Sequence, residues 1–256
     1  MPVATVNSDI GPYELVLLPQ DHISEIIRTT GEPYERMLVA IVRELTRPGD
    51  IVLDIGANLG NHTVYWAMAR RRVIAFEPNP ITRSALVESL GRNKLETLVD
   101  IHPVALSTAS GMGSLTALLA NNQGAIAVEA VAGGEIPIIR LDDLELPEVA
   151  AIKIDVEGAE ENVLLGARQT ISRLRPLIIM EMQGGASDSA GTLLRELGYH
   201  RISTSLAFTP TFLYIPSLRS IPVLFRSPNL LALYIRNLII NAVATLRGNA
   251  HRHRVE

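Results

Sequence analysis

The sequence predicts an α/β fold in which a mainly parallel sheet carries helices on both faces. Short apolar runs rich in β-branched residues alternate with stretches of helical periodicity from residue 51 onward. Strands that are separated by helices pair in parallel through right-handed crossovers, which place the helices on the two faces of the sheet. We find no internal repeat with a period of 20–50 residues, so a solenoid or a propeller is not expected.

The predicted elements follow one another along the chain. Residues 22–45 have helical periodicity and are expected to cover the sheet. The expected strands are 51–55, 73–77, 98–106, 136–141, 149–155, 176–182 and 199–208. The expected helices between them are 61–71, 81–93, 159–174 and 190–198. Residues 111–134 are rich in Gly, Ala and Asn, and we expect this insert to return over the sheet and to shape the acceptor site.

The composition is that of an ordinary globular protein. The 256 residues are 47% hydrophobic and 20% charged, which suffices for one large domain with a small appendage. The formal net charge is −4 with acids and bases mixed along the chain, which argues against nucleic acid as a main partner. The chain has no cysteine, so disulfides, thiolate nucleophiles and cysteine-based zinc sites are excluded.

Three segments are expected: a helical cover at 1–46, the main α/β domain at 47–222, and an apolar helix with a basic tail at 223–256. The last segment lacks the roughly 20 apolar residues that span a bilayer. Its wide apolar face predicts packing on its own domain, on a second copy in a homodimer, or on a membrane surface. The first ten residues do not form a secretory signal, so a cytoplasmic protein is expected.

The first strand ends in "LDIGANLG", which is typical of a cofactor loop. Asp54, Gly56, Asn58 and Gly60 are expected there, and missing Cβ atoms let backbone N–H groups and the helix N-terminus approach a ligand. Ligands of open parallel sheets bind at the carboxyl ends of the strands. Asparagine replaces glycine at positions 58 and 61 of the dinucleotide pattern, and Asp54 would repel a pyrophosphate. NAD is therefore disfavoured.

A second acid closes the next strand. Glu77 in "AFEPN" follows Gly56 by 21 residues, where a carboxylate can accept hydrogen bonds from both ribose hydroxyls. An acid before the glycine turn and an acid at the end of the next strand favour S-adenosylmethionine over NAD.

Five segments occur in a distinctive order and approximate spacing: "VLDIGANLGNHTVYWA", "VIAFEPNP", "IIRLDDL", "IKIDVEGAEENVLLGA" and "PLIIMEM". Together they resemble the FkbM-type family of methyltransferases, from about Tyr34 to about Met182. The resemblance implies a seven-stranded Rossmann-like methyltransferase fold, with S-adenosylmethionine as methyl donor and S-adenosylhomocysteine as product. It also implies O-methylation of a hydroxyl on a sugar, glycolipid or polyketide.

The resemblance also assigns cofactor residues by position. It implies that Asp54, Gly56, Asn58 and Gly60 form the cofactor loop and that Glu77 binds the ribose. The segment "DIHPVALS" resembles the adenine side of the family's pocket, which implies that His102, Val104 and Ala105 lie near the base. A purely structural role at a buried strand end is the alternative for these three residues.

Four carboxylates lie within residues 155–161. The helical spacing of the apolar residues that follow puts Glu160 and Glu161 in the first turn of a helix, where the dipole stabilises acids by ~0.3 to 1 kcal/mol. Asp155 and Glu157 precede this helix at the strand's carboxyl end, beside the expected pocket. We predict that Asp155 or Glu157 takes the proton of the acceptor hydroxyl or positions that hydroxyl.

Other residues are candidates for acceptor contact. The segment "GEPYE" resembles a family element that borders the pocket, which implies contact by Tyr34 and Glu35. Glu181 ends a strand at the same edge, and His62 begins the first helix near the cofactor. Lys153, inside its strand, is expected to pair with a neighbouring acid.

No close-spaced ligand cluster marks a metal site. Mg²⁺ held by Asp142, Asp155 and Glu181 is a minor alternative. Asp142 and Asp143 have a simpler explanation, since they suit a turn into the next element. Two other functions stay open: an NAD or nucleotide-sugar enzyme on a similar sheet, and a non-catalytic methyltransferase-like partner domain.

Overall fold

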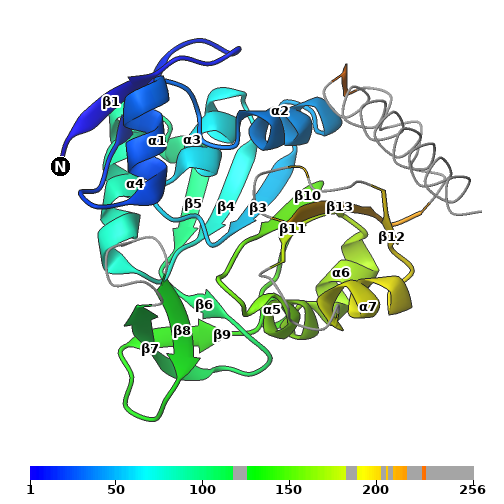
Figure 1. The fold of residues 1–256 in the computed structure, drawn as a ribbon. Helices are drawn as coiled ribbons and strands as arrows, with labels where there is room; N and C mark the ends of the chain where they lie inside the picture. Colours follow the sequence, from blue (N-terminus) through cyan, green and yellow to red (C-terminus); the bar gives the residue numbers. More distant parts are fainter. Residues whose placement is uncertain (118–125, 183–188, 203–205, 207–209, 218–226, 229–256) are drawn as a thin grey trace, which may run out of the picture.

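The computed structural model describes residues 1–117, 126–182, 189–202, 206, 210–217 and 227–228. Its centre is a seven-stranded sheet with the order β12-β13-β11-β10-β3-β4-β5. The strands are β3 (Ile51–Ile55), β4 (Arg72–Phe76), β5 (Val99–His102), β10 (Ala151–Ile154), β11 (Leu177–Glu181), β12 (His200–Arg201) and β13 (Thr211–Ile215). The pairs between β11 and β5 are parallel, and β13 is antiparallel to both of its neighbours. The predicted seven-stranded, mainly parallel sheet is confirmed (Figure 1).

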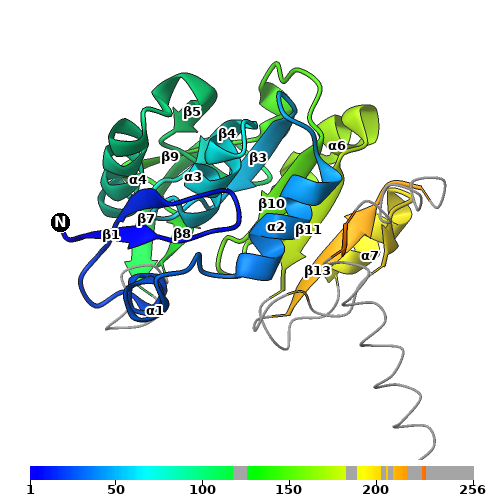
Figure 2. The same cartoon turned by 90° about the horizontal axis from the view of Figure 1, so that it is seen from above.

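The helices form a layer on each face of this sheet, as Figure 2 shows from above. They are α1 (His22–Thr30), α2 (Arg36–Leu45), α3 (Asn61–Met68), α4 (Pro80–Asn93), α5 (Glu160–Gly166), α6 (Arg168–Leu174) and α7 (Ser189–Glu196). Alternate strand residues point to opposite faces. Val52 and Val73 therefore pack with α2, α3 and α4, whereas Leu53 and Ile152 pack with α5, α6 and α7.

The N-terminal cover is only partly helical. β1 (Val3–Val6) and β2 (Tyr13–Val16) form an antiparallel pair before α1 and α2. The backbone N–H of Val16 donates to Ser89 Oγ on α4 at 2.9 Å, which attaches the pair to the main domain. The short strands carry no clear alternation of apolar and polar residues, so they could not be predicted from a local pattern.

A second, four-stranded sheet has the order β6-β9-β7-β8. Its strands are β6 (Ala105–Leu106), β7 (Gly111–Ala117), β8 (Ile126–Ala130) and β9 (Ile136–Ile139). The strand predicted at 98–106 is in fact two strands in two sheets, divided around Pro103, which has no N–H for a ladder. The strand predicted at 136–141 belongs to the small sheet, and the insert supplies the β7–β8 hairpin.

The helix predicted at 159–174 is also two elements, α5 and α6. Gly166 ends α5 against the backbone of Ser107, where a Cβ would lie 2.0 Å from the carbonyl oxygen. Two short 3₁₀ turns, η1 (Glu96–Leu98) and η2 (Leu141–Asp143), complete the described elements.

The strand order reverses between β3 and β10. The chain adds β4 and β5 on one side of β3, and it later adds β10 and β11 on the other side. A crevice at the carboxyl ends of β3 and β10 is the expected ligand site of such a sheet.

The expectations for the C-terminal segment 223–256 lie outside the described residues, which include only 227 and 228 of it. Within the described part of the chain, none of the helices combines the length and the apolar character that crossing a membrane requires.

Candidate active site

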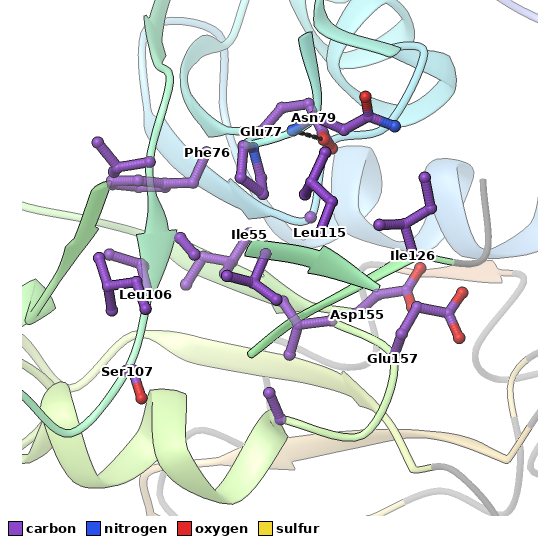
Figure 3. Close-up of a pocket in the computed structure, with 18 of the residues that line it drawn as sticks. Ile55, Phe76, Glu77, Asn79, Leu106, Ser107, Leu115, Ile126, Asp155 and Glu157 are labelled. Carbon is purple, nitrogen blue, oxygen red and sulfur yellow. Dashed lines mark hydrogen bonds between the residues drawn. The ribbon is translucent and has the colours of Figure 1, made fainter. Parts of the chain in front are cut away.

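A pocket opens at the carboxyl ends of β3, β4 and β10, at the reversal of strand order (Figure 3). The segments after these strands line one part of it, and the β7–β8 hairpin lines another. The residues that the sequence predicted and that line it are Gly56, Asn58, Glu77, Val104, Ala105, Asp155 and Glu157. The other predicted residues, Asp54, Gly60, His102, Tyr34, Glu35, His62 and Glu181, are not part of its lining.

The glycines of the first loop are required for a different reason from the one expected. Gly56 has φ +79°, and a Cβ there would lie 1.8 Å from the carbonyl oxygen of Asp155. Gly60 has φ +95°, and its Cβ would lie 2.5 Å from Leu86 Cδ1 on α4. Both missing side chains make room for protein rather than for a ligand. The loop is therefore packed directly against the end of β10.

Glu77 organises the loop from the end of β4. Its side chain is buried, and its two carboxylate oxygens accept the backbone N–H of Asn58 at 2.6 Å and of Asn79 at 2.8 Å. Burial raises the pKa of Glu77, and the hydrogen bonds from Asn79, Thr82 and Asn58 oppose this effect. The carboxylate lies in the pocket wall, where its remaining lone pairs can accept from a ligand.

Asn79, also in the pocket wall, has an unused donor. Its Oδ1 accepts the N–H of Ile81 and caps α4, which begins at Pro80. Its Nδ2 is buried and has no hydrogen-bond partner within the protein. A buried amide of this kind calls for an acceptor, and a bound polar ligand supplies one. Glu77 and Asn79 together fit a nucleoside, because they offer acceptor and donor atoms side by side.

Asp54 stabilises the centre of the sheet instead of lining the pocket. Its fully buried carboxylate accepts from Thr63 Oγ1 at 2.6 Å and lies 3.2 Å from Lys153 Nζ. Lys153 stands opposite Asp54 in the β3–β10 register and donates to the carbonyl of Gly56 at 2.7 Å. Burial would lower the pKa of Lys153, but Asp54 and Asp155 outweigh burial and raise it. The predicted pairing of Lys153 with a neighbouring acid is confirmed.

Two of the three residues expected near the base line the pocket, and the third does not. Val104 and Ala105 line the pocket together with Leu106 and Ser107. The ring of His102 instead stacks on Phe76 with centroids 5.0 Å apart, and Phe76 lines the pocket. His102 therefore packs on a pocket residue and does not line the pocket itself.

Asp155 and Glu157 lie at the end of β10, across the pocket from Glu77 and Asn79 in Figure 3. Asp155 Oδ2 lies 3.4 Å from Lys153 Nζ, and its side chain is 28% exposed, so one end is anchored while the carboxylate stays accessible. Glu157 has φ +56°, a conformation that non-glycine residues adopt at a cost and often at functional sites.

Glu181 lies beside Asp155 at the end of β11. Burial, the charges of Asp155 and Glu35, and a hydrogen bond shared with Asp155 raise the pKa of Glu181 to about 8, although Lys153 opposes this. Near neutral pH the Glu181 carboxyl is therefore protonated and donates to Asp155. Two carboxyl groups that share one proton behave in this way.

The N-terminal cover brings more groups to the same place. Burial and the charges of Glu35, Glu181, Asp155 and Glu157 raise the pKa of Tyr34. Glu35 Oε2 lies 3.2 Å from His62 Nε2, with both side chains more than nine-tenths buried. Of the four residues that the sequence assigned to the acceptor, Tyr34 and Glu181 therefore lie within electrostatic range of Asp155, and His62 lies beside Glu35.

Asp142 is used elsewhere. Its carboxylate accepts the N–H groups of Gln169 at 3.1 Å and Thr170 at 2.8 Å, at the N-terminus of α6. Across the described residues, no group of three or more His, Cys, Asp or Glu side chains is arranged to hold a metal ion.

Several pocket residues were not predicted from the sequence. Leu115, Ile126 and Val128 reach the pocket from the β7–β8 hairpin, and no local pattern indicates this. Asn79 had a detectable pattern, since it directly precedes the Pro80 that starts α4 and follows Glu77 by two residues.

The chain is similar in sequence to two known proteins. The chain is 27% identical over 192 residues to the hexuronic acid methyltransferase AglP of Haloferax volcanii, over 72% of this chain and 76% of that protein. It is 28% identical over 204 residues to the antimetabolite synthetase AmbE of Pseudomonas aeruginosa, over 59% of this chain but only 10% of that protein.

Among solved structures, a methyltransferase FkbM from Methylobacillus flagellatus KT matches with a TM-score of 0.49 and 20% identity, over 66% of this chain and 44% of that chain. The family model for the methyltransferase FkbM domain matches residues 54–201, which is more than half of the chain and includes the cofactor loop, Glu77, Asp155 and Glu181. The chain therefore belongs to the FkbM methyltransferase family.

Proposed function

We propose that this methyltransferase uses S-adenosylmethionine to methylate a hydroxyl of a sugar, glycolipid or polyketide-type acceptor. The observation that carries the proposal is the pocket at the strand reversal, with Glu77 and Asn79 on one wall and Asp155 on the other. The relative AglP is a hexuronic acid methyltransferase, which supports a carbohydrate among these acceptor classes.

The pocket suits the nucleoside part of the cofactor. Glu77 would accept from the ribose hydroxyls, and Asn79 Nδ2 would donate to an acceptor atom of the ligand. The apolar side chains of Val104 and Leu106 would pack against the base. The backbone N–H groups of Asn58 and Asn79 already donate to Glu77, so they are not free to bind a pyrophosphate. This arrangement disfavours a dinucleotide.

The carboxylates at the end of β10 suit the chemistry. When bound, S-adenosylmethionine supplies an electrophilic methyl group on a positively charged sulfur. The Asp155 carboxylate would accept the proton of the acceptor hydroxyl as the new O–C bond forms and the C–S bond breaks. Holding the hydroxyl in line with the methyl group can supply up to roughly 7 to 11 kcal/mol of the barrier.

Glu77→Ala should weaken S-adenosylhomocysteine binding by about 10- to 100-fold, the range expected when a ligand loses hydrogen bonds to a charged group. Asn79→Asp should also weaken binding, since it replaces the unused donor with an acceptor while it preserves the cap on Ile81. Isothermal titration of each variant, with thermal unfolding to verify the fold, measures both effects.

Glu88→Ala is the matched control, because Glu88 is on the outer part of α4 and pairs with Arg92 in solvent. It should bind like the wild type. If Glu77→Ala and Asn79→Asp both fold and bind S-adenosylhomocysteine with wild-type affinity, this pocket does not bind the nucleoside.

A further inference from the structure

A group of mostly acidic side chains adjoins the cofactor pocket through Asp155. We call it the carboxylate compartment and define it by Tyr34, Glu35, Asp155, Glu157 and Glu181. Asp155 and Glu157 also line the pocket, whereas Tyr34 and Glu35 come from the segment before α2 and Glu181 from the end of β11. The parallel pairing of β10 with β11 puts the carboxyl ends of these strands side by side, and the charges of all four acids reach Tyr34.

Glu35 gives this compartment a buried hydrogen-bond acceptor without a partner. Its side chain is 4% exposed, and its Oε1 has no hydrogen-bond partner. His62 Nε2 lies 3.2 Å from Glu35 Oε2 but makes no hydrogen bond with it. The charge of Glu35 acts on Tyr34, Lys153 and Glu181, so its carboxylate lies within electrostatic range of these groups. A buried carboxylate oxygen without a donor is costly, and an N–H or O–H group of a ligand would satisfy it.

The charge balance of the compartment is negative. Lys153 pairs with Asp155, but it also pairs with the fully buried Asp54, which offsets its charge. Burial and the neighbouring acids raise the pKa of Glu181 to about 8, which favours its neutral, protonated form near neutral pH. A further carboxylate brought by a ligand would be repelled by the ionised acids of the compartment, as like charges are when they are buried together.

We propose that the carboxylate compartment binds the methyl acceptor and selects for sugars that present hydroxyl or amine donors and no negative charge. This inference rests on the proposed function. The proposed acceptor differs from that of the relative AglP, a hexuronic acid methyltransferase, because a hexuronic acid carries a carboxylate. Amines are favoured most, because a protonated amine adds the attraction of its positive charge to its hydrogen bond with the Glu35 carboxylate.

Three glycosides of matched size test the selectivity: methyl glucoside, methyl glucosaminide and methyl glucuronide. Ligand-observed NMR on the protein saturated with S-adenosylhomocysteine measures their binding. The glucoside and the glucosaminide should bind at least about tenfold more tightly than the glucuronide. Glu35→Gln should narrow this difference, because it removes a negative charge. Glu181→Gln, which resembles the protonated form, should leave the difference unchanged, as should Glu32→Gln, an exposed partner of Arg36 nearby. Equal signals from all three glycosides, including none from any, or a preference for the glucuronide would overturn the proposal.

The pH dependence of stability tests the protonation of Glu181 separately from acceptor binding. The pKa of Glu181 is about 8 in the folded protein and ordinarily 4.5, so its proton contributes stability that is complete below pH 4.5 and lost as the pH rises through 8. Asp155, Glu35, Lys153 and Tyr34 are the charged and titratable groups that face it. Glu181→Gln resembles the protonated form and should lose less thermal stability than the wild type between pH 5 and pH 9. An equal loss in both proteins would contradict this account of the compartment.

Binding of S-adenosylhomocysteine separates the two proposals. If the protein does not bind it, the proposed function fails, whatever the glycosides do. If it binds it and shows no charge selectivity, only the acceptor inference fails.

Discussion

Asp155→Asn is expected to lower methyl transfer by at least about a hundredfold, the usual contribution of a general base, while S-adenosylhomocysteine binding stays nearly intact. Asp155 lies where the pocket meets the carboxylate compartment, and asparagine preserves its size but cannot take a proton. Lys153 keeps Asp54 as its partner, so the sheet should remain folded. Transfer of a tritiated methyl group to the best glycoside acceptor, together with titration, measures both quantities.

Glu161→Gln is the control for this variant. Glu161 is in the first turn of α5, only six residues away, and accepts from Ser189 Oγ on the surface. Its activity should equal that of the wild type. Full activity in Asp155→Asn would end the assignment of Asp155 as the base and leave Glu157 as the candidate.

Gly56→Ala is expected to lower the free energy of unfolding by roughly 3 to 5 kcal/mol, from overpacking together with the strain of a left-handed residue. The added Cβ would lie 1.8 Å from the backbone carbonyl oxygen of Asp155. Asp155 directly follows the central strand β10, so this backbone atom cannot move aside as a flexible side chain would. The variant should also bind S-adenosylhomocysteine poorly, because β3 and β10 must separate at the pocket. Denaturant unfolding measures the stability.

Gly158→Ala separates the clash from the strain. Gly158 has φ +99°, similar to the φ of Gly56, but nothing lies within 4 Å of its Cβ position. Strain alone should cost about 1 to 2 kcal/mol there. Equal losses in the two variants would show that the contact between Gly56 and Asp155 is not tight.

The central strands could be predicted because local and tertiary preferences agree there. Residues 51–55 form an apolar β-branched run before a glycine turn, and the strand has these bounds. The small sheet could not be predicted, since β6 pairs with β9 more than 30 residues later, and pairing over such distances leaves no local pattern. The helical periodicity of 159–174 is continuous, so it did not predict the break between helices at Gly166. That break depends on the contact of Gly166 with Ser107.

The candidate site divides in the same way. The sequence predicted the position of Glu77, Asp155 and Glu181, because each ends or follows a strand and parallel strands end at one edge of the sheet. Asp54 satisfied the same pattern, yet the register places it opposite Lys153 inside the sheet. The hairpin residues Leu115 and Ile126 reach the pocket only through the tertiary fold.

The most direct test is isothermal titration of the wild-type protein with S-adenosylhomocysteine and, in a parallel experiment, with NAD⁺. Micromolar binding of S-adenosylhomocysteine, without binding of NAD⁺, is the predicted result. Binding of NAD⁺ alone, or of neither ligand, would contradict the use of S-adenosylmethionine by this chain.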